Sequence, residues 1–328
     1  MLVPADHHQI NRKRTLLTWA MLILAVIIAI VFVVFDLPKA WQFVIERRIV
    51  TAVGLSVVGI AIGASTVLFQ TITANKILTP SLMGFDAMFV LIQTVIVFVF
   101  GTVLFNNADT LFLFALNSLT MMGFSILLFW VVFSGGRMSI DLLLLIGIVV
   151  GVLFRSLSAL LGRMIDPGEF QVLQDRFFAT FSFIDVRLLI VTSIVTLLVI
   201  TAIWIKRRTF DVILLGRDQA ISLGVNYRSE VIFALLACSL LVSASTALVG
   251  PVTFFGLIVA NLAYIIVRTD RHAWTIPMAC ALGMLSLVAG QWILSRIFAF
   301  NTSLSVIIEF LGGILFLYLL LSKKGLSR

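Results

Sequence analysis

The chain has 328 residues, of which 61% are hydrophobic and only 12% are charged. Ordinary soluble domains have about 45–50% apolar and about 25% charged residues, so this composition excludes a soluble globular protein and indicates an all-α polytopic membrane protein. The net charge of +8 does not indicate nucleic-acid binding, because the basic residues are spread over many short segments instead of forming one cluster.

Long apolar stretches predict about ten transmembrane helices. A helix needs about 20 apolar residues to cross the hydrocarbon core, so ten crossings leave room for short loops but not for a separate soluble domain. We therefore expect one transmembrane domain over residues 1–328. The stretches are 15–35, 49–69, 81–101, 111–133, 140–162, 187–205, 230–249, a short eighth at 252–267, 274–294 and 304–321.

The basic residues predict the orientation of the chain. With the N-terminus inside, fifteen of the 23 Lys and Arg residues fall on the cytoplasmic side, seven fall outside, and Arg155 lies within a span. This excess is typical of cytoplasmic loops. Residues 1–14 and 322–328 are then cytoplasmic tails, and 206–230 is a cytoplasmic loop between the sixth and seventh spans. The first apolar run lacks a small-residue cleavage site and is a retained span.

The loop 206–230 alternates charged and apolar residues between two strongly apolar stretches. Arg217 and Asp218 precede Ile221 and Leu223, and Gly224 follows them. This pattern predicts a short amphipathic helix with a glycine stop. Its apolar face either lies on the bilayer surface or fills a groove on a soluble partner.

A Gly-Pro pair interrupts the apolar pattern after the seventh span. Proline suits the first turn of a helix, and broken helices occur at membrane depth where protein or a water-filled cavity satisfies the backbone. We therefore expect a short re-entrant helix from Gly250 to Gly256 beside a translocation path. A plain turn at the outer face is the alternative.

Ionisable residues inside the spans are costly and mark function or a buried pair. Arg155 in the fifth span and Glu309 in the tenth either pair across a pore or each lie close enough to an interface to reach water. Cys238 and Cys280 fall in apolar spans and behave as small hydrophobes. The three histidines lack the company that a metal site needs, so we interpret them as solvated surface residues and expect no metal site.

Three motifs in order resemble the iron-siderophore and cobalamin permease family, the membrane subunits of type II ABC importers. The second span closes on a Gln and is followed by an Asn-x-x-Leu-x-Pro-Ser-x-x-Gly stretch. A Leu-Gly-x-x-x-Ala-x-x-Leu-Gly segment follows in the loop at 206–230, and a Gly-rich segment with Phe254, Phe255 and Gly256 follows the seventh span. The first motif is matched by Gln70, Asn75, Leu78, Pro80, Ser81 and Gly84.

This resemblance implies the type II ABC importer permease fold, a single permease domain, and roles for particular residues. An ATPase would dock on the coupling segment formed by Leu215, Gly216, Arg217, Asp218, Ala220, Leu223 and Gly224. The translocation path would be lined by Gly250, Pro251, Phe254, Phe255, Gly256, Arg155 and Glu309. A binding protein would dock on the outer face at Arg47, Arg48 and, as a weaker candidate, Arg296; interfacial anchoring is the alternative role for these arginines.

The chain has no G-x-x-x-x-G-K-[ST] loop to hold nucleotide phosphates, so it is not expected to be an enzyme or to bind a cofactor. The resemblance assigns ATP and Mg²⁺ to a separate ATPase subunit. The further partners that it implies are a periplasmic or lipoprotein siderophore-binding protein, a second permease chain, identical or homologous, and membrane lipid. The location that it implies is the bacterial cytoplasmic (inner) membrane.

Departures from the family pattern, such as Ala260-Asn261 and Gly290-Gln291, resemble the branch that imports ferric siderophores, including catecholate types. One alternative keeps the family and changes the cargo to haem or cobalamin. A second is a secondary transporter that uses Arg155, Glu309 or Asp86 as its ion-coupling group. A scaffold without transport is disfavoured, because a scaffold needs neither broken helices nor a coupling segment.

Overall fold

The computed structural model describes residues 7–35, 41–134, 140–181, 184–297 and 303–321, and regular structure in these ranges is entirely helical. The elements in chain order are α1 (His7–Val34), α2 (Trp41–Thr73), the 3-10 helix η1 (Pro80–Met83), α3 (Phe85–Asn107), α4 (Thr110–Ser134), α5 (Ile140–Gly162), α6 (Pro167–Asp175), α7 (Val186–Ile213), α8 (Arg217–Ser222), α9 (Tyr227–Val249), α10 (Phe255–Val267), α11 (His272–Ile297) and α12 (Leu304–Leu321).

The membrane-spanning pattern expected from the sequence is confirmed. Within the described ranges, eight helices are long and apolar enough to cross a membrane, and α10 and α12 are shorter apolar helices. Together these helices coincide with the ten predicted stretches. The shortness of the eighth stretch is also confirmed, because α10 has 13 residues.

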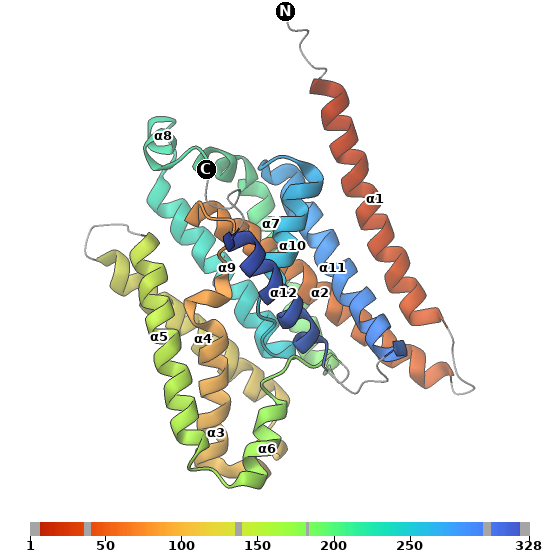
Figure 1. The fold of residues 1–328 in the computed structure, drawn as a ribbon, viewed down its shortest axis with the longest axis vertical. Coiled ribbons are helices and arrows are strands. Elements are labelled where there is room, and N and C mark those ends of the chain that lie inside the picture. The colour runs from red at the N-terminus through yellow and green to blue at the C-terminus, as the bar shows by residue number, and fades with distance from the viewer. Residues whose placement is uncertain (1–6, 36–40, 135–139, 182–183, 298–302, 322–328) are drawn as a thin grey trace, which may run out of the picture.

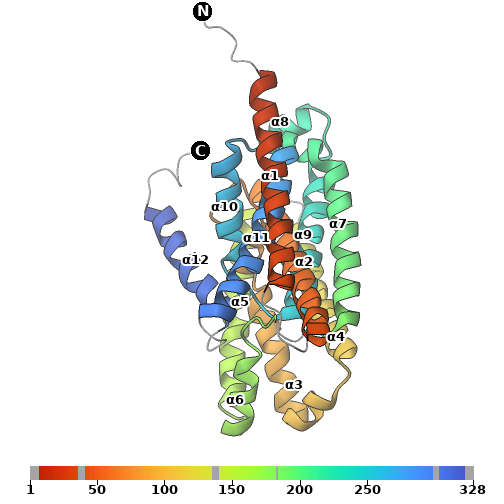
Figure 2. The ribbon, with the colours of Figure 1, turned by 90° about the vertical axis from the view of Figure 1, so that its right-hand side faces the viewer.

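The short helices mark the two ends of the bundle. Figures 1 and 2 show α8 at the same end as the first turns of α1 and the last turns of α12, whereas α6 lies at the opposite end. Helix α6 lies between the predicted stretches 140–162 and 187–205, and Asp166-Pro167 is its helix-start signal. Asp166 accepts a hydrogen bond from Gly168 N at 2.9 Å, and Pro167 occupies the first turn.

Two helices form the centre of the bundle. In the most apolar windows of α2 and α9, 72% and 67% of residues are buried, compared with 17% for α1 and for α5. Close approach of backbones makes this possible: a Cβ on Gly59 would collide with the backbone of Gly283, and one on Gly63 would lie 2.7 Å from Ala279 O. The weakly buried helices therefore present their apolar faces to lipid or to another chain.

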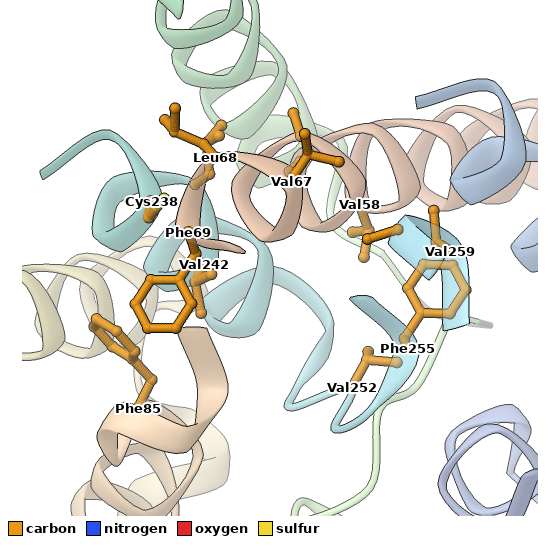
Figure 3. Close-up of a cluster of buried hydrophobic side chains, with 14 of the residues drawn as sticks. Val58, Val67, Leu68, Phe69, Phe85, Cys238, Val242, Val252, Phe255 and Val259 are labelled. Atoms are coloured by element: carbon orange, nitrogen blue, oxygen red, sulfur yellow. The ribbon is translucent and has the colours of Figure 1, made fainter. Parts of the chain in front are cut away.

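The central core joins α2 to α3, α9 and α10. Figure 3 shows the rings of Phe69 and Phe85 side by side next to Val242, while Phe255 lies near Val58. These side chains are at most 5% exposed. Burying such side chains contributes about 1.5–3 kcal/mol each when water is the reference, so this cluster fixes the start of α3 and the start of α10 relative to α2.

Two segments predicted to lie outside the spans contain helix. Residues 7–14 form the first turns of α1, and Arg14 donates to the carbonyls of Val267 and Arg268 at 3.1 and 2.9 Å. The predicted tail 322–328 and residues 1–6 lie outside the described residues. Helix α7 continues to Ile213, so only residues 214–226 of the predicted loop 206–230 connect the two spans.

Candidate functional site: the coupling helix and the central break

The motif around Gln70 builds the tight connection between α2 and α3. Gln70 Nε2 donates to Lys76 O at 2.7 Å, and Asn75 N donates to Gln70 O at 3.2 Å. Asn75 Oδ1 in turn accepts from Ile77 N at 2.9 Å. Each motif side chain thus satisfies a backbone group of the turn, which explains why amide residues occupy these two positions.

The second half of the motif starts α3. Pro80 stands in the first turn of η1, and Gly84 ends it with φ +90°, a conformation that L side chains rarely adopt. Gly84 also lies against α5, because a Cβ on it would sit 3.2 Å from Gly147 O and from Gly151 Cα. Leu78 and Ser81 are partly buried in the same connection. The third span therefore begins at Phe85, not at residue 81 as predicted.

The coupling segment is confirmed as a short helix between two glycines. Gly216 has φ +100° and precedes α8, and Gly224, with φ +84°, follows it. Ala220 is fully buried and anchors the helix, because Val225 N donates to its carbonyl at 3.0 Å. Arg217 and Asp218 form the exposed first turn.

The apolar side chains of this segment point away from the chain's own core. Leu215, Ile221 and Leu223 are 55%, 50% and 63% exposed. Figure 1 shows α8 projecting at the end of the bundle. An apolar tip on a helix held by glycine turns is the kind of surface that fits a groove on another protein.

An ion pair holds the two helices that carry the segment. Lys206 Nζ on α7 lies 2.6 and 2.8 Å from the two carboxylate oxygens of Glu230 on α9. The ammonium group also lies 4.6 Å from the centre of the Phe233 ring. Both charged side chains are partly buried. The base of the coupling segment is therefore braced across α7 and α9.

His272 was wrongly interpreted as a solvated residue. Its side chain is 0% exposed, with Nδ1 2.7 Å from Asp211 Oδ1 and Nε2 2.8 Å from Thr71 Oγ1. Its backbone N–H also donates to Asp211 Oδ1 at 2.8 Å. The histidine thus ties the last turns of α2 and α7 to the first turn of α11. Its partner Asp211 lies two residues before the end of α7 at Ile213.

The central break lies between α9 and α10, and here the predicted helix Gly250–Gly256 is wrong. Residues 250–254 are not helical, and α10 begins at Phe255. Gly250 has φ +101° and ψ 173°, and Phe254 has φ +60°. Thr180 N donates to Val249 O at 2.8 Å, so the segment after α6 satisfies a carbonyl that the break leaves free.

Buried packing fixes the conformation of the break. A Cβ on Gly250 would lie 3.1 Å from Ala179 Cα, and one on Gly256 would collide with Thr66 on α2. Pro251 is buried between them. Gly312 of α12 lies against the Phe254 side chain, and the rings of Phe254 and Phe316 are 5.8 Å apart. The break is therefore a contact point for α2, α12 and the segment after α6.

Arg155 lies on α5 and Glu309 on α12, and the structure does not join the two side chains. The charged groups described in the structure include no hydrogen bond or ion pair between them. Thr253 in the break donates to Asp86 Oδ2 at 2.9 Å. Sequence reasoning named Asp86 only as an alternative and missed Thr253.

The arginines predicted to dock a binding protein lie near the end of α1. Arg48 donates to Phe35 O at 2.6 Å and so caps the end of α1, and Arg296 lies 5.4 Å from the centre of the Phe35 ring. Arg47 is exposed on α2. Nearby on the same end, hydrogen bonding to Arg187 lowers the pKa of Asp185, which caps α7.

Comparison with models of known protein families places this chain among known proteins. The model described as the FecCD transport family matches residues 15–322. The chain belongs to the FecCD transport family. The match covers the connection at 70–84, the coupling segment and the central break.

Several relatives of this family member are named as permease proteins of iron-chelate import or transport systems. The chain is 43% identical over 301 residues to the petrobactin import system permease protein YclO of Bacillus subtilis, covering 92% of this chain and 95% of that protein. It is 36% identical to the petrobactin import system permease protein FatC of Bacillus anthracis, covering 86% and 80%. The ferric enterobactin permease protein FepD of Escherichia coli is 26% identical, covering 85% and 82%.

The fold of this FecCD family member is that of an ABC importer permease. A solved structure of a metal-chelate type ABC transporter in an inward-facing conformation superposes with a TM-score of 0.81 at 20% identity, covering 94% of this chain and 99% of that chain. The predicted fold class is therefore confirmed. The sequence predicted the short helix of the coupling segment, whose docking role stays a prediction. The His272 contacts join residues too far apart in the chain for any local pattern to reveal.

Proposed function

We propose that this FecCD family member is the permease subunit of an ATP-driven importer that moves a ferric siderophore inward across the bacterial cytoplasmic membrane. The observation that carries the proposal is the 43% identity to a petrobactin import permease over 92% of the chain. Haem or cobalamin is the weaker alternative as cargo, because the vitamin B12 import permease BtuC of Yersinia pseudotuberculosis is only 25% identical.

The coupling segment supports an external ATPase. Leu215, Ile221 and Leu223 expose apolar surface at the tip of α7 and α8, and an ATPase subunit that uses ATP and Mg²⁺ would bury it. Movement of α8 would pass to α7 and to α11 through Asp211 and His272. The chain itself carries out no covalent chemistry and holds no cofactor in this scheme. An ion-coupled transporter has no use for such a handle.

A second permease chain would complete the path. In Bacillus anthracis two different proteins, FatC and FatD, are both petrobactin import permeases, and this chain is 36% and 26% identical to them. Apolar side chains on α5 and α12, such as Leu153 and Leu311, are exposed on the single chain. We propose that a homologous partner covers this face, so that the central breaks of both chains line one path.

The proposed orientation of the chain in the membrane is set by the side on which the ATPase docks. With α8 in the cytoplasm, α6 and the arginines near Phe35 face outward, and both termini are cytoplasmic. A siderophore-binding protein would then dock near Arg47, Arg48 and Arg296, and carboxylates on its surface would pair with these arginines.

Reconstitution tests the proposal. The permease, its candidate partner chain and ATPase subunits are placed in liposomes with ATP inside, and the binding protein loaded with an iron-55 chelate is added outside. The proposal predicts iron uptake and ATP hydrolysis that the binding protein stimulates. Uptake that follows a proton or sodium gradient and ignores ATP would contradict it and favour the ion-coupled alternative.

A further inference from the structure

A cavity of about 400 Å³ lies beside the central break, at the end of the bundle that carries α6 (Figure 1). Its walls come from α3, α4, the end of α6, the start of α7 and the last turn of α9. This volume falls within the range of small-molecule sites, about 300–1,000 Å³. The coupling segment, α5 and α12 contribute nothing to its walls, so the cavity is separate from the surfaces assigned to an ATPase and to a second permease chain.

Two buried carboxamide side chains form part of the cavity wall. Gln93 on α3 is 6% exposed and Asn117 on α4 is 3% exposed. Gln93 Nε2 donates to Asn117 Oδ1 at 3.4 Å, and Asn117 Nδ2 donates to Leu113 O at 2.7 Å. Gln93 Oε1 is buried and accepts no hydrogen bond from any described residue. An unpaired buried acceptor costs free energy, so a hydrogen-bond donor in the cavity would stabilise this wall.

The last turn of α9 brings backbone acceptors to the same cavity. Ala247, Leu248 and Val249 line it, and the last carbonyls of a helix have no partner within the helix. Pro251 has no N–H to donate to Ala247 O, and no described N–H donates to Leu248 O, whereas Val249 O accepts from Thr180 N at 2.8 Å. A helix C-terminus also carries the negative end of the helix dipole, which favours a cation.

The charges at the rim of the cavity nearly balance. Asp175 and Arg176 are both exposed there. Asp185 accepts from Thr110 Oγ1 at 2.8 Å and pairs with Arg187 at 3.2 Å. The rim therefore favours neither sign of charge strongly. The unpaired acceptors and the helix C-terminus, which lie deeper in the wall, decide which ligand fits.

These acceptors fit an organic cation better than a metal ion. Among the residues that the structure describes, no group of three or more His, Cys, Asp or Glu side chains could hold a metal. A primary ammonium group carries three N–H donors and no acceptor, so it matches a wall with unpaired oxygens. The rings of Phe89, Phe114 and Phe178 also line the cavity, and aromatic rings suit both the apolar stem and the charge of an alkylammonium ion.

We propose that this cavity binds a primary ammonium group, with Gln93 Oε1 and the carbonyl oxygens of Ala247 and Leu248 as its acceptors. In the orientation proposed above the cavity faces outward, so the group comes either from a lysine side chain of the docked binding protein or from a small free amine. The lysine source rests on the proposed import function. Binding of a free amine does not depend on it.

The first test measures amine binding to the purified chain in detergent. The probe is n-butylamine, the side-chain analogue of lysine, and binding is followed by saturation-transfer NMR. We expect saturable binding that Gln93→Leu weakens about tenfold to a hundredfold, the loss expected for a hydrogen bond to a charged group. Gln93→Glu places a carboxylate opposite the ammonium and should strengthen binding. The uncharged n-butanol, of similar length, should bind far more weakly.

A matched control lies next to Gln93 on the same helix. Thr94 is 1% exposed, does not line the cavity, and donates to Val90 O within α3 at 2.8 Å. Thr94→Val should therefore leave the affinity for n-butylamine unchanged, and thermal unfolding checks that each variant is folded. Equal binding of the amine to the wild type and to Gln93→Leu, or equal binding of n-butanol, would overturn the inference, because water alone would then account for the cavity.

The second test distinguishes the two sources of the ammonium group. The affinity of the binding protein is measured for the wild-type permease and for Gln93→Leu, with and without n-butylamine. For a lysine source, Gln93→Leu should weaken docking about tenfold and the amine should compete with it. For a free amine, neither change should affect docking. The proposed function fails separately: a wild-type importer that takes up no ferric chelate with ATP refutes it and leaves the amine measurement standing.

Discussion

The coupling segment and the central break both turn on a glycine, and the two glycines have nearly the same backbone conformation. Gly216 has φ +100° and ψ 165°, and Gly250 has φ +101° and ψ 173°. Their surroundings are opposite. A Cβ on Gly216 would meet only Gln219 Oε1 at 3.9 Å, whereas one on Gly250 would press on the backbone of Ala179 at 3.1 Å.

This difference shows that the same glycine conformation can form an exposed turn or a tightly packed one. At Gly216 the turn presents apolar side chains to the outside, so its shape must persist without support from neighbours. At Gly250 the surrounding segments fix the turn, so that Thr253 lies beside Asp86 of α3 and Phe254 lies beside Gly312 of α12. The first region leaves apolar side chains exposed, whereas the second is held in place by its neighbours.

The largest effect should come from Gly250→Ala. Backbone strain in this region of φ and ψ costs about 1–3 kcal/mol, and overpacking against Ala179 adds about as much. We expect a loss of about 2–6 kcal/mol in the free energy of unfolding, measured by denaturation in detergent. Gly216→Ala is the matched control, because it carries the strain without the overpacking. Equal losses for the two variants would show that packing around the break is unimportant.

The next effect should come from His272→Ala. The change leaves Asp211 and Thr71 without their side-chain partner, and a lost pair of this kind costs about 1–3 kcal/mol. Because His272 joins α11 to the end of α7, we also expect ATP hydrolysis to continue with less chelate imported per ATP. The measurement is the ratio of iron uptake to phosphate release. An unchanged ratio would refute the mechanical role.

The exposed tip of α8 should affect function without affecting stability. Changing Ile221 and Leu223 to Asp should leave the unfolding temperature within about 2 °C, since surface substitutions are usually within about 0.5 kcal/mol. Recovery of the ATPase subunit with the tagged permease should fall about tenfold or more, because an apolar contact becomes a buried charge. The control pair changes Leu197 and Leu198, which are exposed on α7 within the span, to Ala. Normal recovery with the Asp variant would contradict the assigned interface.

The smallest effect should come from Lys206→Met. The ion pair with Glu230 is partly exposed, and pairs of this kind contribute about 1 kcal/mol or less. Methionine keeps the apolar stem that packs along Phe233. We therefore expect a small loss of stability and near-normal transport, measured by unfolding and uptake together. Loss of ATP-driven transport at normal stability would show that the Lys206–Glu230 ion pair itself takes part in coupling.

Local patterns predicted most of the membrane-spanning architecture and the coupling segment. The helix α8 and its stop at Gly224 follow from alternating residues and glycine punctuation, which act within a few positions. The break at Gly250 was found for the same reason. Its shape was predicted wrongly as a helix, because the contacts on residues 250–254 come from Ala179 and Gly312, which are distant in the sequence.

The same reasoning explains the missed residues. His272 reads as a loop histidine until the structure places Asp211 and Thr71 beside it, 61 and 201 positions away. Thr253 reads as an ordinary residue after Gly250-Pro251 until α3 brings Asp86 within hydrogen-bond distance. Arg155 and Glu309 were identified by their cost within a span, a local signal, but whether they meet depends on how α5 and α12 pack.

Labelling at Leu223 tests whether an ATPase subunit docks on the coupling segment at the cytoplasmic side. The chain has two cysteines, Cys238, which is buried, and Cys280, which is partly buried, so Leu223→Cys creates the one strongly exposed thiol among the described residues. In oriented membrane vesicles we expect an impermeant maleimide to label this thiol from the cytoplasmic side alone. We also expect bound ATPase subunit to protect it. Labelling from the outer side, or no protection by the ATPase, would refute the docking of the ATPase on this segment.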